Sequence, residues 1–565
     1  MTKKILIVGG VAGGASAAAR LRRLDEQAEI IIFERGPYIS FANCGLPYYI
    51  GRSIKERDDL LLMTPQQFNK RFNVDVRVNN EVLKINRDKK LIEVKDLESG
   101  NNYSESYDKL ILSPGAESVK PDIEGIDSDR VFTLRNIPDM DRIDEFITKN
   151  KAKRAVVVGA GYIGLEMAEN LRDRGMLVAI VEMTDQVMPF LDKEMANLLH
   201  QNLWQNSVAL WLGDTVFNFK HTDSQLHVGL KSGVELSCDF AVLAVGVKPE
   251  IKLAKEARLE IGSHHGIKVN EYLQTSDPDI YAIGDAIEVK DLVLGDSTLI
   301  PLAGPANKQG RLVADNICRK NRSYNGTQNT SVLKLFDYTV AMTGASEKVL
   351  KKTDIDYEKL YIHPANHVGY YPGAKQMHIK LLFSKPQGKI LGAQIVGKDG
   401  VDRRIDIFAV AIRAGMTVFD LQELDLAYAP PYGSGKDAVN MAGFTASNIL
   451  DDTVNVVHWN ELNDDDFILD VRTKKEFDAN NVPGAINIPL NELRNSLESL
   501  PRDKIINAYC GVGIRSYIAA RILMQSGFNV KNISGGFLTY LSFAEGWLRE
   551  PEDAKQLKKE FCTGY

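Results

Sequence analysis

The chain has 565 residues, which is too many for one hydrophobic core because domains commonly hold about 100–200 residues. Hydrophobic residues make up 44% of it and charged residues 25%, a composition that excludes intrinsic disorder. The formal net charge of −6 gives the whole chain no attraction to nucleic acid. No apolar run approaches the roughly 18 residues that span a bilayer, so we expect no membrane partner.

The five cysteines form no CxxC pair and no Cys/His cluster with metal-ligand spacing, so we expect no metal site. An odd, sparse set also argues against a disulfide scaffold and for a reducing compartment, which predicts a cytoplasmic protein. The N-terminal stretch MTKKILIVGG runs directly into a glycine turn, which is typical of a first β-strand rather than a signal peptide.

Two segments share one plan: an apolar run, a glycine turn, a helical pattern and a second apolar run that ends in glutamate. The apolar runs cover residues 4–8 and 30–34 in the first segment, and 154–158 and 178–182 in the second. Each segment predicts a βαβ unit. A later apolar run, at 280–286, is expected to return to the first domain.

The second glycine turn, GAGYIG, is a complete GxGxxG motif formed by Gly159, Gly161 and Gly164. Glycine lets a diphosphate approach the backbone closely, and the following helix directs its N-terminus at the phosphates. Glu182 follows Gly164 by 18 residues, where a carboxylate accepts from a ribose 2′-hydroxyl and repels a 2′-phosphate. The segment therefore predicts a site that prefers NADH over NADPH.

The first glycine turn, GGVAGG, keeps Gly9 and Gly14 but has Val11 at the central position. Glu34 follows Gly14 by 20 residues, as a ribose-binding carboxylate should. The stretch TSDPDIYAIGD at 275–285 resembles the second flavin fingerprint, in which Asp285 would bind the ribityl chain.

Together these elements resemble the pyridine nucleotide-disulfide oxidoreductase family over about residues 1–445. The resemblance implies an FAD-binding domain at 1–150 and 250–330, an NADH-binding domain at 151–249, and a dimerisation domain at 331–450 that forms a homodimer. It implies FAD contacts at Gly9, Ala12, Gly14, Glu34, Arg35, Asp285 and Ala303. It implies NADH contacts at Gly159, Gly161, Tyr162, Ile163, Gly164, Glu166 and Glu182.

Cys44 lies in the stretch SFANCGLPYY and lacks the second cysteine of the CxxxxC motif that dithiol-reducing members carry. A single redox thiol must form a mixed disulfide, a persulfide or a sulfenic acid with something outside the chain. Three single-cysteine relatives fit: coenzyme A-disulfide reductase, NADH oxidase and NADH peroxidase. The peroxidase places a histidine where this chain has Ala12, which disfavours peroxide chemistry.

The stretches SFANCGLPY and AYAPPYGSGKD resemble coenzyme A-disulfide reductases. The resemblance implies that Tyr370 and Tyr428 reach the cysteine of the other subunit. It implies coenzyme A contacts at Ser16, Arg20, Arg23, Ser40, Asn43, Arg71, Asn307 and Lys436, although Lys70 could replace Arg71. Arginine forks suit phosphates, but a run such as RLRR is also typical of a solvated helix face.

The last segment, 455–565, resembles a rhodanese domain through FILDVRTKKEF, VPGAINIP and the loop CGVGIRS. A loop wrapped around Cys510 at a helix N-terminus directs N–H groups at sulfur and stabilises a persulfide anion. The loop residues singled out with Cys510 are Gly511, Gly513, Arg515 and Ser516. Asn481 stands where most relatives have histidine. A degenerate domain used only for docking is the alternative.

The predicted fold is therefore α/β, with two Rossmann-like domains, an α+β dimerisation domain and a C-terminal rhodanese domain. We expect NADH and FAD to serve reduction of coenzyme A persulfide, polysulfide and coenzyme A disulfide through Cys44, with Cys510 carrying sulfane sulfur. Cys238, Cys318 and Cys562 are interpreted as structural or incidental. Two alternatives stay open: an NADH oxidase, and a redox-sensing interaction protein.

Overall fold

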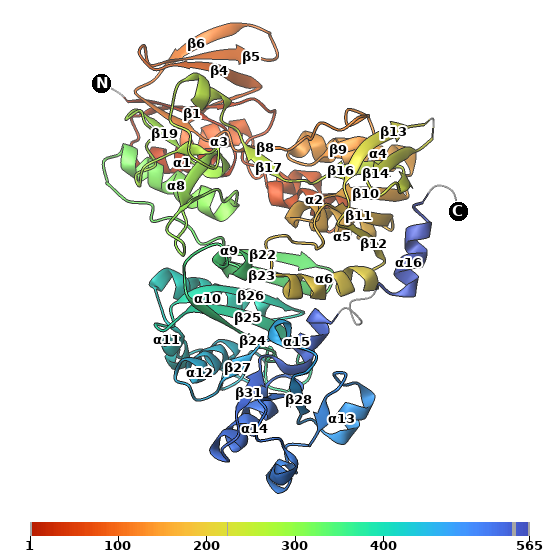
Figure 1. Cartoon of the computed structure of the whole chain (residues 1–565). Helices are drawn as coiled ribbons and strands as arrows, with labels where there is room; N and C mark the ends of the chain where they lie inside the picture. Colours follow the sequence, from red (N-terminus) through yellow and green to blue (C-terminus); the bar gives the residue numbers. More distant parts are fainter. Residues whose placement is uncertain (1–2, 223, 545–549, 563–565) are drawn as a thin grey trace. The chain divides into compact units, whose positions relative to one another are not determined.

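The computed structural model describes residues 3–222, 224–544 and 550–562. The chain forms two compact units, coloured by sequence in Figure 1. The first comprises Met1–Met183, Gly213–Thr327 and Lys559–Tyr565, and the second comprises Thr184–Leu212 and Gln328–Lys558. Both units contain sheets and helices, which confirms the α/β class. Within the described residues, no helix is both long and apolar enough to cross a membrane.

The first unit contains a parallel sheet with the strand order β19-β7-β1-β2-β3. The strands are β1 (Lys4–Val8), β2 (Glu29–Glu34), β3 (Asp75–Val78), β7 (Lys109–Leu112) and β19 (Ile280–Ala282). The β-branched runs of the central strands are almost fully buried, as parallel strands covered on both faces require. Ile280 pairs with Leu110, which confirms that the run at 280–286 returns to the first domain.

Helices α1 (Ala12–Leu24) and α8 (Ala303–Ile317) pack side by side in this unit (Figure 1). A Cβ at Gly310 would lie 2.4 Å from the Gly13 carbonyl oxygen, so only glycine allows the two helices to approach this closely. Gly9, at φ +96°, makes the turn that leads into α1.

A second parallel sheet contains β11-β10-β16-β9 in that order. Its strands are β9 (Val131–Thr133), β10 (Arg154–Val158), β11 (Leu177–Glu182) and β16 (Phe240–Leu243), with α4 (Ile137–Asn150) and α5 (Tyr162–Asp173) as its principal helices. Two antiparallel sheets consist of β4 (Asn80–Asn86), β5 (Leu91–Asp96) and β6 (Asn102–Ser106), and of β13 (Val216–His221), β14 (Leu226–Leu230) and β15 (Glu235–Cys238). The shorter elements of the unit are α2 (Leu46–Ile50), α3 (Pro65–Phe72), α7 (Lys252–Glu256), β8 (Ala116–Ser118), β17 (Val247–Pro249), β18 (Ile267–Lys268), β20 (Ile287–Lys290) and β21 (Ser297–Thr298).

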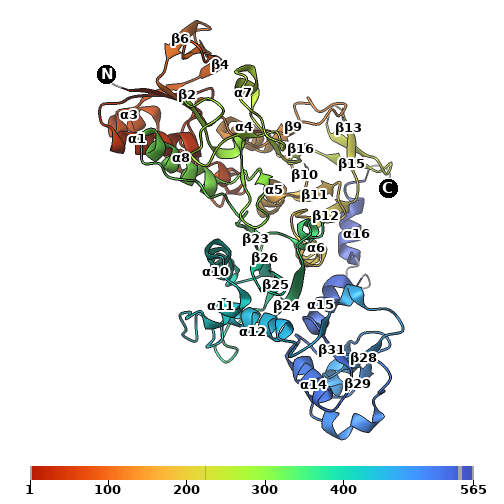
Figure 2. The ribbon, with the colours of Figure 1, turned by 60° about the vertical axis from the view of Figure 1, so that its left-hand side comes forward.

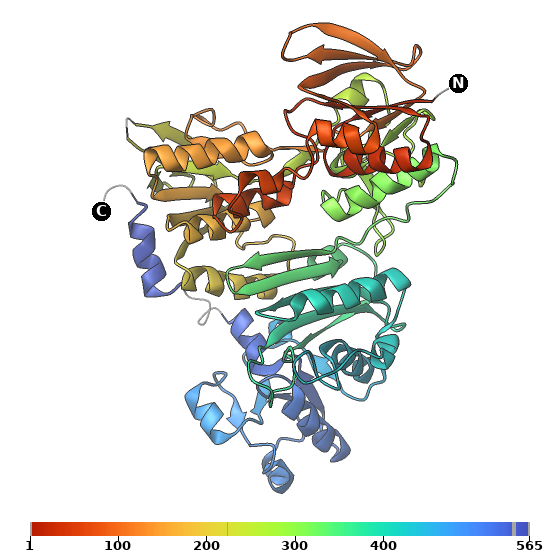
Figure 3. The same ribbon diagram turned by 180° about the vertical axis from the view of Figure 1, so that it is seen from behind.

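The second unit is built on an antiparallel sheet with the order β22-β23-β26-β25-β24. Its strands are β22 (Ser331–Leu335), β23 (Tyr338–Gly344), β24 (Tyr357–Ile362), β25 (Met377–Ser384) and β26 (Ile390–Gly397). Helix α10 (Val401–Ala414) lies along β23 and β26 (Figure 3). The remaining elements are α6 (Lys193–Gln205), β12 (Val208–Leu212), α9 (Glu347–Leu350), α11 (Val418–Glu423) and α12 (Ala438–Leu450).

The same unit contains a small parallel sheet with the order β27-β31-β30-β28-β29, which lies with α14 in the blue part of Figure 2. Its strands are β27 (Val456–Val457), β28 (Phe467–Asp470), β29 (Ile486–Asn487), β30 (Ile506–Tyr509) and β31 (Val530–Ile533). The helices of this domain are α13 (Lys474–Ala479), α14 (Ile514–Gln525) and α15 (Gly536–Phe543). Helix α16 (Glu552–Lys559) comes after them in the chain. Strand β28 begins the stretch FILDVRTKKEF, and β30 leads directly into the loop CGVGIRS.

This small domain is docked on β24. The Tyr361 backbone N–H donates to Ser534 Oγ at 3.0 Å, and His363 Nε2 lies 2.7 Å from Thr539 Oγ1. Tyr361 and His363 are buried, as are their two partners. Strand β24 and helix α15 therefore share one packed interface.

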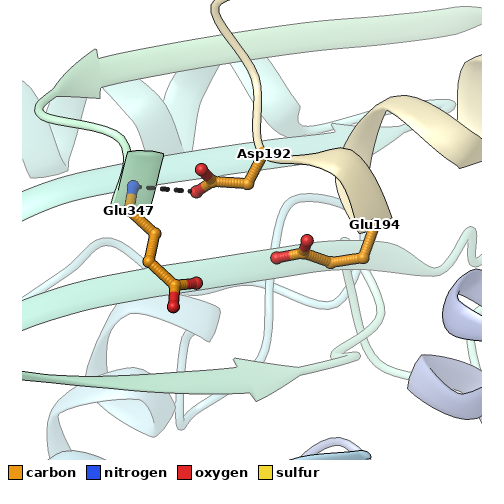
Figure 4. A group of neighbouring side chains, drawn as sticks. All are labelled: Asp192, Glu194 and Glu347. Atoms are coloured by element: carbon orange, nitrogen blue, oxygen red, sulfur yellow. Dashed lines mark hydrogen bonds between the residues drawn. The ribbon is translucent and has the colours of Figure 1, made fainter. Parts of the chain in front are cut away.

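A cluster of buried charges also supports this unit. Figure 4 shows the carboxylates of Asp192, Glu194 and Glu347, whose oxygen atoms lie within 4.8 Å of one another. Lys380, which is fully buried, places Nζ 2.9, 2.5 and 2.6 Å from these three groups. Its ammonium group occupies the position that a cation would take among three carboxylates. The cluster joins α6, α9 and β25.

Candidate active site

The first glycine turn is held by Glu34, at the end of β2. The Gly10 N–H donates to Glu34 Oε2 and the Gly36 N–H donates to Oε1, both at 2.9 Å. Burial raises the pKa of Glu34 although both N–H groups oppose this. A Cβ at Gly14 would lie 1.9 Å from the Gly9 carbonyl oxygen, which explains why these two predicted glycines are needed.

The second glycine turn repeats this arrangement with Glu182. The Ala160 N–H donates to Glu182 Oε2 at 2.8 Å. A Cβ at Gly164 would lie 2.0 Å from the Gly159 carbonyl oxygen, whereas a Cβ at Gly161 would meet open space. The open side of Gly161 is where a diphosphate can approach the backbone.

These observations fit the binding of a dinucleotide diphosphate at each glycine turn. Neither Val11 nor Gly161, the N-cap residues of α1 and α5, caps its helix with a side chain, so phosphates can accept from the first-turn N–H groups. Ala12, Tyr162 and Ile163 lie in these first turns, and Ala303 begins α8. Arg35 Nη1 lies 3.5 Å from Glu250 Oε2.

Cys44 lies in a short 3₁₀ turn, Asn43–Gly45, which leads into α2. Its side chain is exposed, and its backbone N–H donates to Asn43 Oδ1 at 3.1 Å. Partial burial raises the pKa of the Cys44 thiol, the carboxylates of Glu166 and Asp285 raise it further, and Arg135 opposes them. The fold therefore brings together three residues that the sequence assigned to the thiol, NADH and FAD.

Glu166 lies on α5 and accepts from Tyr48 Oη at 3.4 Å. Burial raises the pKa of Glu166 to about 7, and the nearby Glu169 contributes in the same direction. Tyr48 lies one helical turn after Cys44, and burial together with Glu166 raises the pKa of its hydroxyl. Glu166 therefore changes charge near neutral pH beside the thiol.

A cavity of about 320 Å³ opens between α1 and α8. It is lined by Ala15, Ser16, Ala19, Arg20, Arg23, Ser40, Met63, Phe68, Phe72, Asn307 and Arg311. Five residues predicted to contact coenzyme A are in this set: Ser16, Arg20, Arg23, Ser40 and Asn307. Ser16 Oγ donates to Asn307 Oδ1 at 2.6 Å, which links the two helices. Ser40 connects the cavity to the Cys44 turn, four residues later.

The three arginines of RLRR have different environments. Arg20 Nη2 pairs with the buried Asp315 at 2.8 Å, while Arg23 is exposed at the cavity. Arg22 is buried and donates to the carbonyl oxygens of Phe72, Asp25, Glu26, Ala28 and Asn73. Of the arginines in this motif, Arg23 is therefore the best placed to receive a phosphate.

The other predicted coenzyme A residues lie elsewhere. Asn43 is in the Cys44 turn, and α3 contributes Phe68 and Phe72 to the cavity rather than Arg71. Lys436 is exposed in the second unit. Tyr370 and Tyr428 also belong to that unit, where their hydroxyl groups lie 2.9 Å apart. Their side chains are 75% and 48% exposed, so both hydroxyl groups are available to a ligand or a second copy.

Cys510 follows β30 directly and is buried at the base of its loop. The Gly513 N–H donates to Cys510 Sγ at 3.2 Å, and Ser516 Oγ lies 3.6 Å from the same sulfur. The Cys510 and Gly511 carbonyls accept from the Phe537 and Leu538 N–H groups at 2.7 and 3.0 Å. The start of α15 thus holds the back of the loop while donors face the sulfur.

The Asn481 side chain donates to the Phe477 carbonyl at 3.0 Å, so it supports the end of α13. Arg515 forms two hydrogen bonds with Glu476, at 2.8 and 2.6 Å. Sequence reasoning did not single out Glu476, Arg135 or Arg311. Each comes from a segment distant from the motif it joins, and only an acidic or basic side chain marks it in the sequence. Gly536 was missed too, although a Cβ there would lie 2.3 Å from the Cys510 carbonyl oxygen.

Three family models match the chain. The model described as pyridine nucleotide-disulphide oxidoreductase matches residues 3–310, and the dimerisation domain of that family matches residues 330–438. The chain belongs to the pyridine nucleotide-disulphide oxidoreductase family. A rhodanese-like domain matches residues 456–542. The matches to this flavoprotein family and to the rhodanese-like domain confirm the resemblance seen in the sequence, and the protein is an oxidoreductase.

Similar proteins cover from 79% to 96% of this family member. A coenzyme A disulfide reductase of Staphylococcus haemolyticus is 38% identical over 79% of this chain and 100% of its own length. The crystal structure of reduced Bacillus anthracis CoADR-RHD is 52% identical, with a TM-score of 0.94, over 96% of this chain and 98% of that one. An NAD-dependent persulfide reductase from A. fulgidus is 38% identical, with a TM-score of 0.90, over 95% of this chain and 100% of that one.

Proposed function

We propose that the protein uses NADH and FAD to reduce coenzyme A disulfide and coenzyme A persulfide or polysulfide through Cys44, with Cys510 carrying sulfane sulfur. The observation that carries the proposal is the cavity between α1 and α8, which has Arg23 and Arg311 at its lining and leads through Ser40 to the Cys44 turn. Coenzyme A has phosphates at one end and a thiol at the other, so its binding site needs cations that are remote from the nucleophilic cysteine.

Glu34 and the turn at Gly9–Gly14 would hold FAD, and Glu182 with the turn at Gly159–Gly164 would hold NADH. When bound, the two groups supply the electron pair that returns the oxidised thiol to a thiolate. Phe68, Phe72 and Met63 offer an apolar wall for the adenine of coenzyme A.

The Cys44 thiolate attacks one sulfur of coenzyme A disulfide, so the S–S bond breaks, a mixed disulfide forms on Cys44, and one coenzyme A thiolate leaves. With coenzyme A persulfide, attack on the inner sulfur gives the same mixed disulfide and releases hydrosulfide, whereas attack on the outer sulfur releases coenzyme A. Tyr370 and Tyr428, from the partner subunit of a homodimer, would donate hydrogen bonds to the leaving thiolate. Their exposed, paired hydroxyl groups support this role.

The test is anaerobic NADH oxidation with coenzyme A persulfide, with coenzyme A disulfide and without an acceptor, followed by admission of air. We expect rapid turnover with both acceptors and sulfide release from the persulfide. Turnover only after air is admitted would instead identify an NADH oxidase. No turnover with any thiol substrate would favour a redox-sensing interaction protein.

Substitution of each cysteine tests its proposed role separately. Cys44→Ser should abolish reduction of both substrates while flavin binding and flavin reduction by NADH persist, because only the nucleophile is lost. Cys510→Ser should retain coenzyme A disulfide reduction and lose activity that depends on sulfane transfer from polysulfide. Flavin absorbance measures flavin binding and reduction, and NADH absorbance measures the rate with each substrate. Equal loss of the two activities in Cys510→Ser would contradict the proposed division of roles.

A further inference from the structure

The Cys510 loop has one basic side chain, Arg515, and an acidic residue of another helix binds it. Glu476 lies on α13, and its two carboxylate oxygens accept from Arg515 Nη1 and Nη2 at 2.8 and 2.6 Å. This two-point geometry is the strongest that a guanidinium makes with a carboxylate. Hydrogen bonding to Arg515 lowers the pKa of Glu476 to about 2, so the carboxylate is charged at neutral pH.

Arg515 also lies beside the reactive sulfur. Its guanidinium interacts electrostatically with Cys510, and a Cβ at Gly511 would lie 3.5 Å from Arg515 Nη2. The Arg515 guanidinium therefore borders the loop. However, Nη1 and Nη2, the two donors that a bidentate anion would use, are already bound to Glu476. An anionic sulfur donor that entered the loop would have to compete with this carboxylate.

The exposed residues next in sequence are apolar. Ile514 lies within the loop and is 58% exposed, and Ile518, one turn later on α14, is 41% exposed. Exposed isoleucine offers nothing to a small dianion, whereas it can contact the aliphatic arm of an organic thiol.

We propose that Glu476 sets the substrate class of the Cys510 loop: it keeps Arg515 from an anionic donor, so that the loop takes sulfane sulfur from persulfides of organic thiols and discriminates against thiosulfate. The inference rests on the proposed function, in which Cys510 carries sulfane sulfur. The Cys510 thiolate attacks the outer sulfur of R–S–SH, the donor S–S bond breaks, Cys510–S–SH forms and the thiolate R–S⁻ leaves. With thiosulfate the same attack gives Cys510–S–S⁻ and releases sulfite. Glu476 acts through Arg515 and is a positioning residue.

Glu476→Gln is the informative variant. Glu476 Oε2 also accepts from the Thr473 N–H at 3.0 Å, and the Thr473 hydroxyl accepts from the Glu476 N–H, which forms a capping box. Glutamine retains capping-box geometry, so the substitution removes the charge and leaves the start of α13 supported. Asp478→Asn is the matched control, because Asp478 is on the same helix and pairs with Lys474 rather than with the loop.

The full-length, FAD-loaded protein is assayed for sulfur transfer to cyanide, with thiosulfate or coenzyme A persulfide as donor. The rate of Cys510→Ser is subtracted as the direct reaction of donor with cyanide. We expect Glu476→Gln to raise kcat/KM for thiosulfate about fivefold to tenfold, since the released guanidinium can bind the dianion. We expect kcat/KM for the persulfide to stay within about twofold, and Asp478→Asn to leave both values unchanged.

The double variant Glu476→Gln/Arg515→Gln identifies the route of the effect. If Glu476 acts through Arg515, the gain with thiosulfate disappears in the double variant. Alkylation of Cys510 by iodoacetamide, followed by peptide mass spectrometry, should accelerate about threefold at pH 7 in Glu476→Gln and not in the double variant. A merely structural role for Glu476 would not produce this pattern.

Unchanged thiosulfate kinetics in Glu476→Gln, or an equal loss with both donors, would overturn the inference. So would a gain that survives removal of Arg515. These results differ from a failure of the proposed function, which would appear as persulfide transfer that does not depend on Cys510.

Discussion

Glu166 shows how a single side chain can tune the site. It lies on α5, contacts Tyr48 and contributes to the raised pKa of the Cys44 thiol. Because burial raises the pKa of Glu166 to about 7, its charge changes in the range where a cell operates. Below that pH the carboxyl is neutral and no longer opposes formation of the thiolate.

Glu166→Gln should therefore lower the pKa of Cys44, because a neutral amide replaces a charge that disfavours the thiolate. We expect the midpoint of Cys44 alkylation against pH to move down by about half a unit to one unit. Peptide mass spectrometry after iodoacetamide treatment measures it. Glu29→Gln, at an exposed ion pair with Lys4, is the control. A midpoint that stays in place or rises would contradict the assigned electrostatics.

Helix α1 carries two neighbouring arginines with different environments. Arg22 points into the protein and satisfies five carbonyl oxygens, two of them at Phe72 and Asn73, where α3 ends. Arg23 points to the cavity and is exposed. One helix thus both fixes α3 and places a cation at the cavity, where we propose that it binds a phosphate.

Arg22→Ala should destabilise the protein by about 2–4 kcal/mol, because it leaves buried carbonyl groups without donors. Arg23→Ala should leave the free energy of unfolding nearly unchanged and raise KM for coenzyme A disulfide about fivefold to tenfold. Urea denaturation and steady-state kinetics measure the two effects. Finding the larger loss of stability in Arg23→Ala would contradict the assignment.

Local patterns predicted the elements well, since β-branched runs and glycine turns depend on neighbours in sequence. The runs at 4–8 and 154–158 are strands, and the run at 280–286 begins with one, β19. Gly9 and Gly159, which precede α1 and α5, are required by close backbone contacts. Patterns could not separate Arg22 from Arg23, because two of the carbonyl groups that fix Arg22, those of Phe72 and Asn73, lie about fifty residues away in sequence. Arg311 and Glu476 were missed for the same reason: each meets the site only after the chain folds.

At the scale of the whole molecule, the buried charges around Lys380 connect distant segments of the second unit. Asp192 and Glu194 come from the start of α6, and Glu347 from α9. Burial alone would raise the pKa of Glu347, but Lys380 and Lys359 outweigh it and lower that pKa. A carboxylate with a lowered pKa contributes stability above its unfolded pKa and loses that contribution as pH falls.

Lys380→Met should reverse the dependence of this stability contribution on pH. Three buried carboxylates would lose a shared cation, which we expect to cost about 3–5 kcal/mol at pH 8. Burial, which acts to raise the pKa of Glu347, is then opposed less, so the deficit should shrink as pH falls from 8 to 5. Thermal unfolding across this range measures it, with the exposed Lys398→Met as control. A deficit that grows on acidification would contradict the account.

The interface between β24 and α15 bears on the modularity of the chain. Gly535 leaves no room for a Cβ, which would lie 2.7 Å from the Tyr361 Cβ, and the next residues of α15 hold the Cys510 and Gly511 carbonyls. The Cys510 loop is thus shaped partly by a strand that belongs to the preceding domain. The dimerisation and rhodanese-like domains lie in one compact unit and share this interface, so we expect them to unfold together. An exchange of rhodanese modules between such proteins would have to carry its own matching β24.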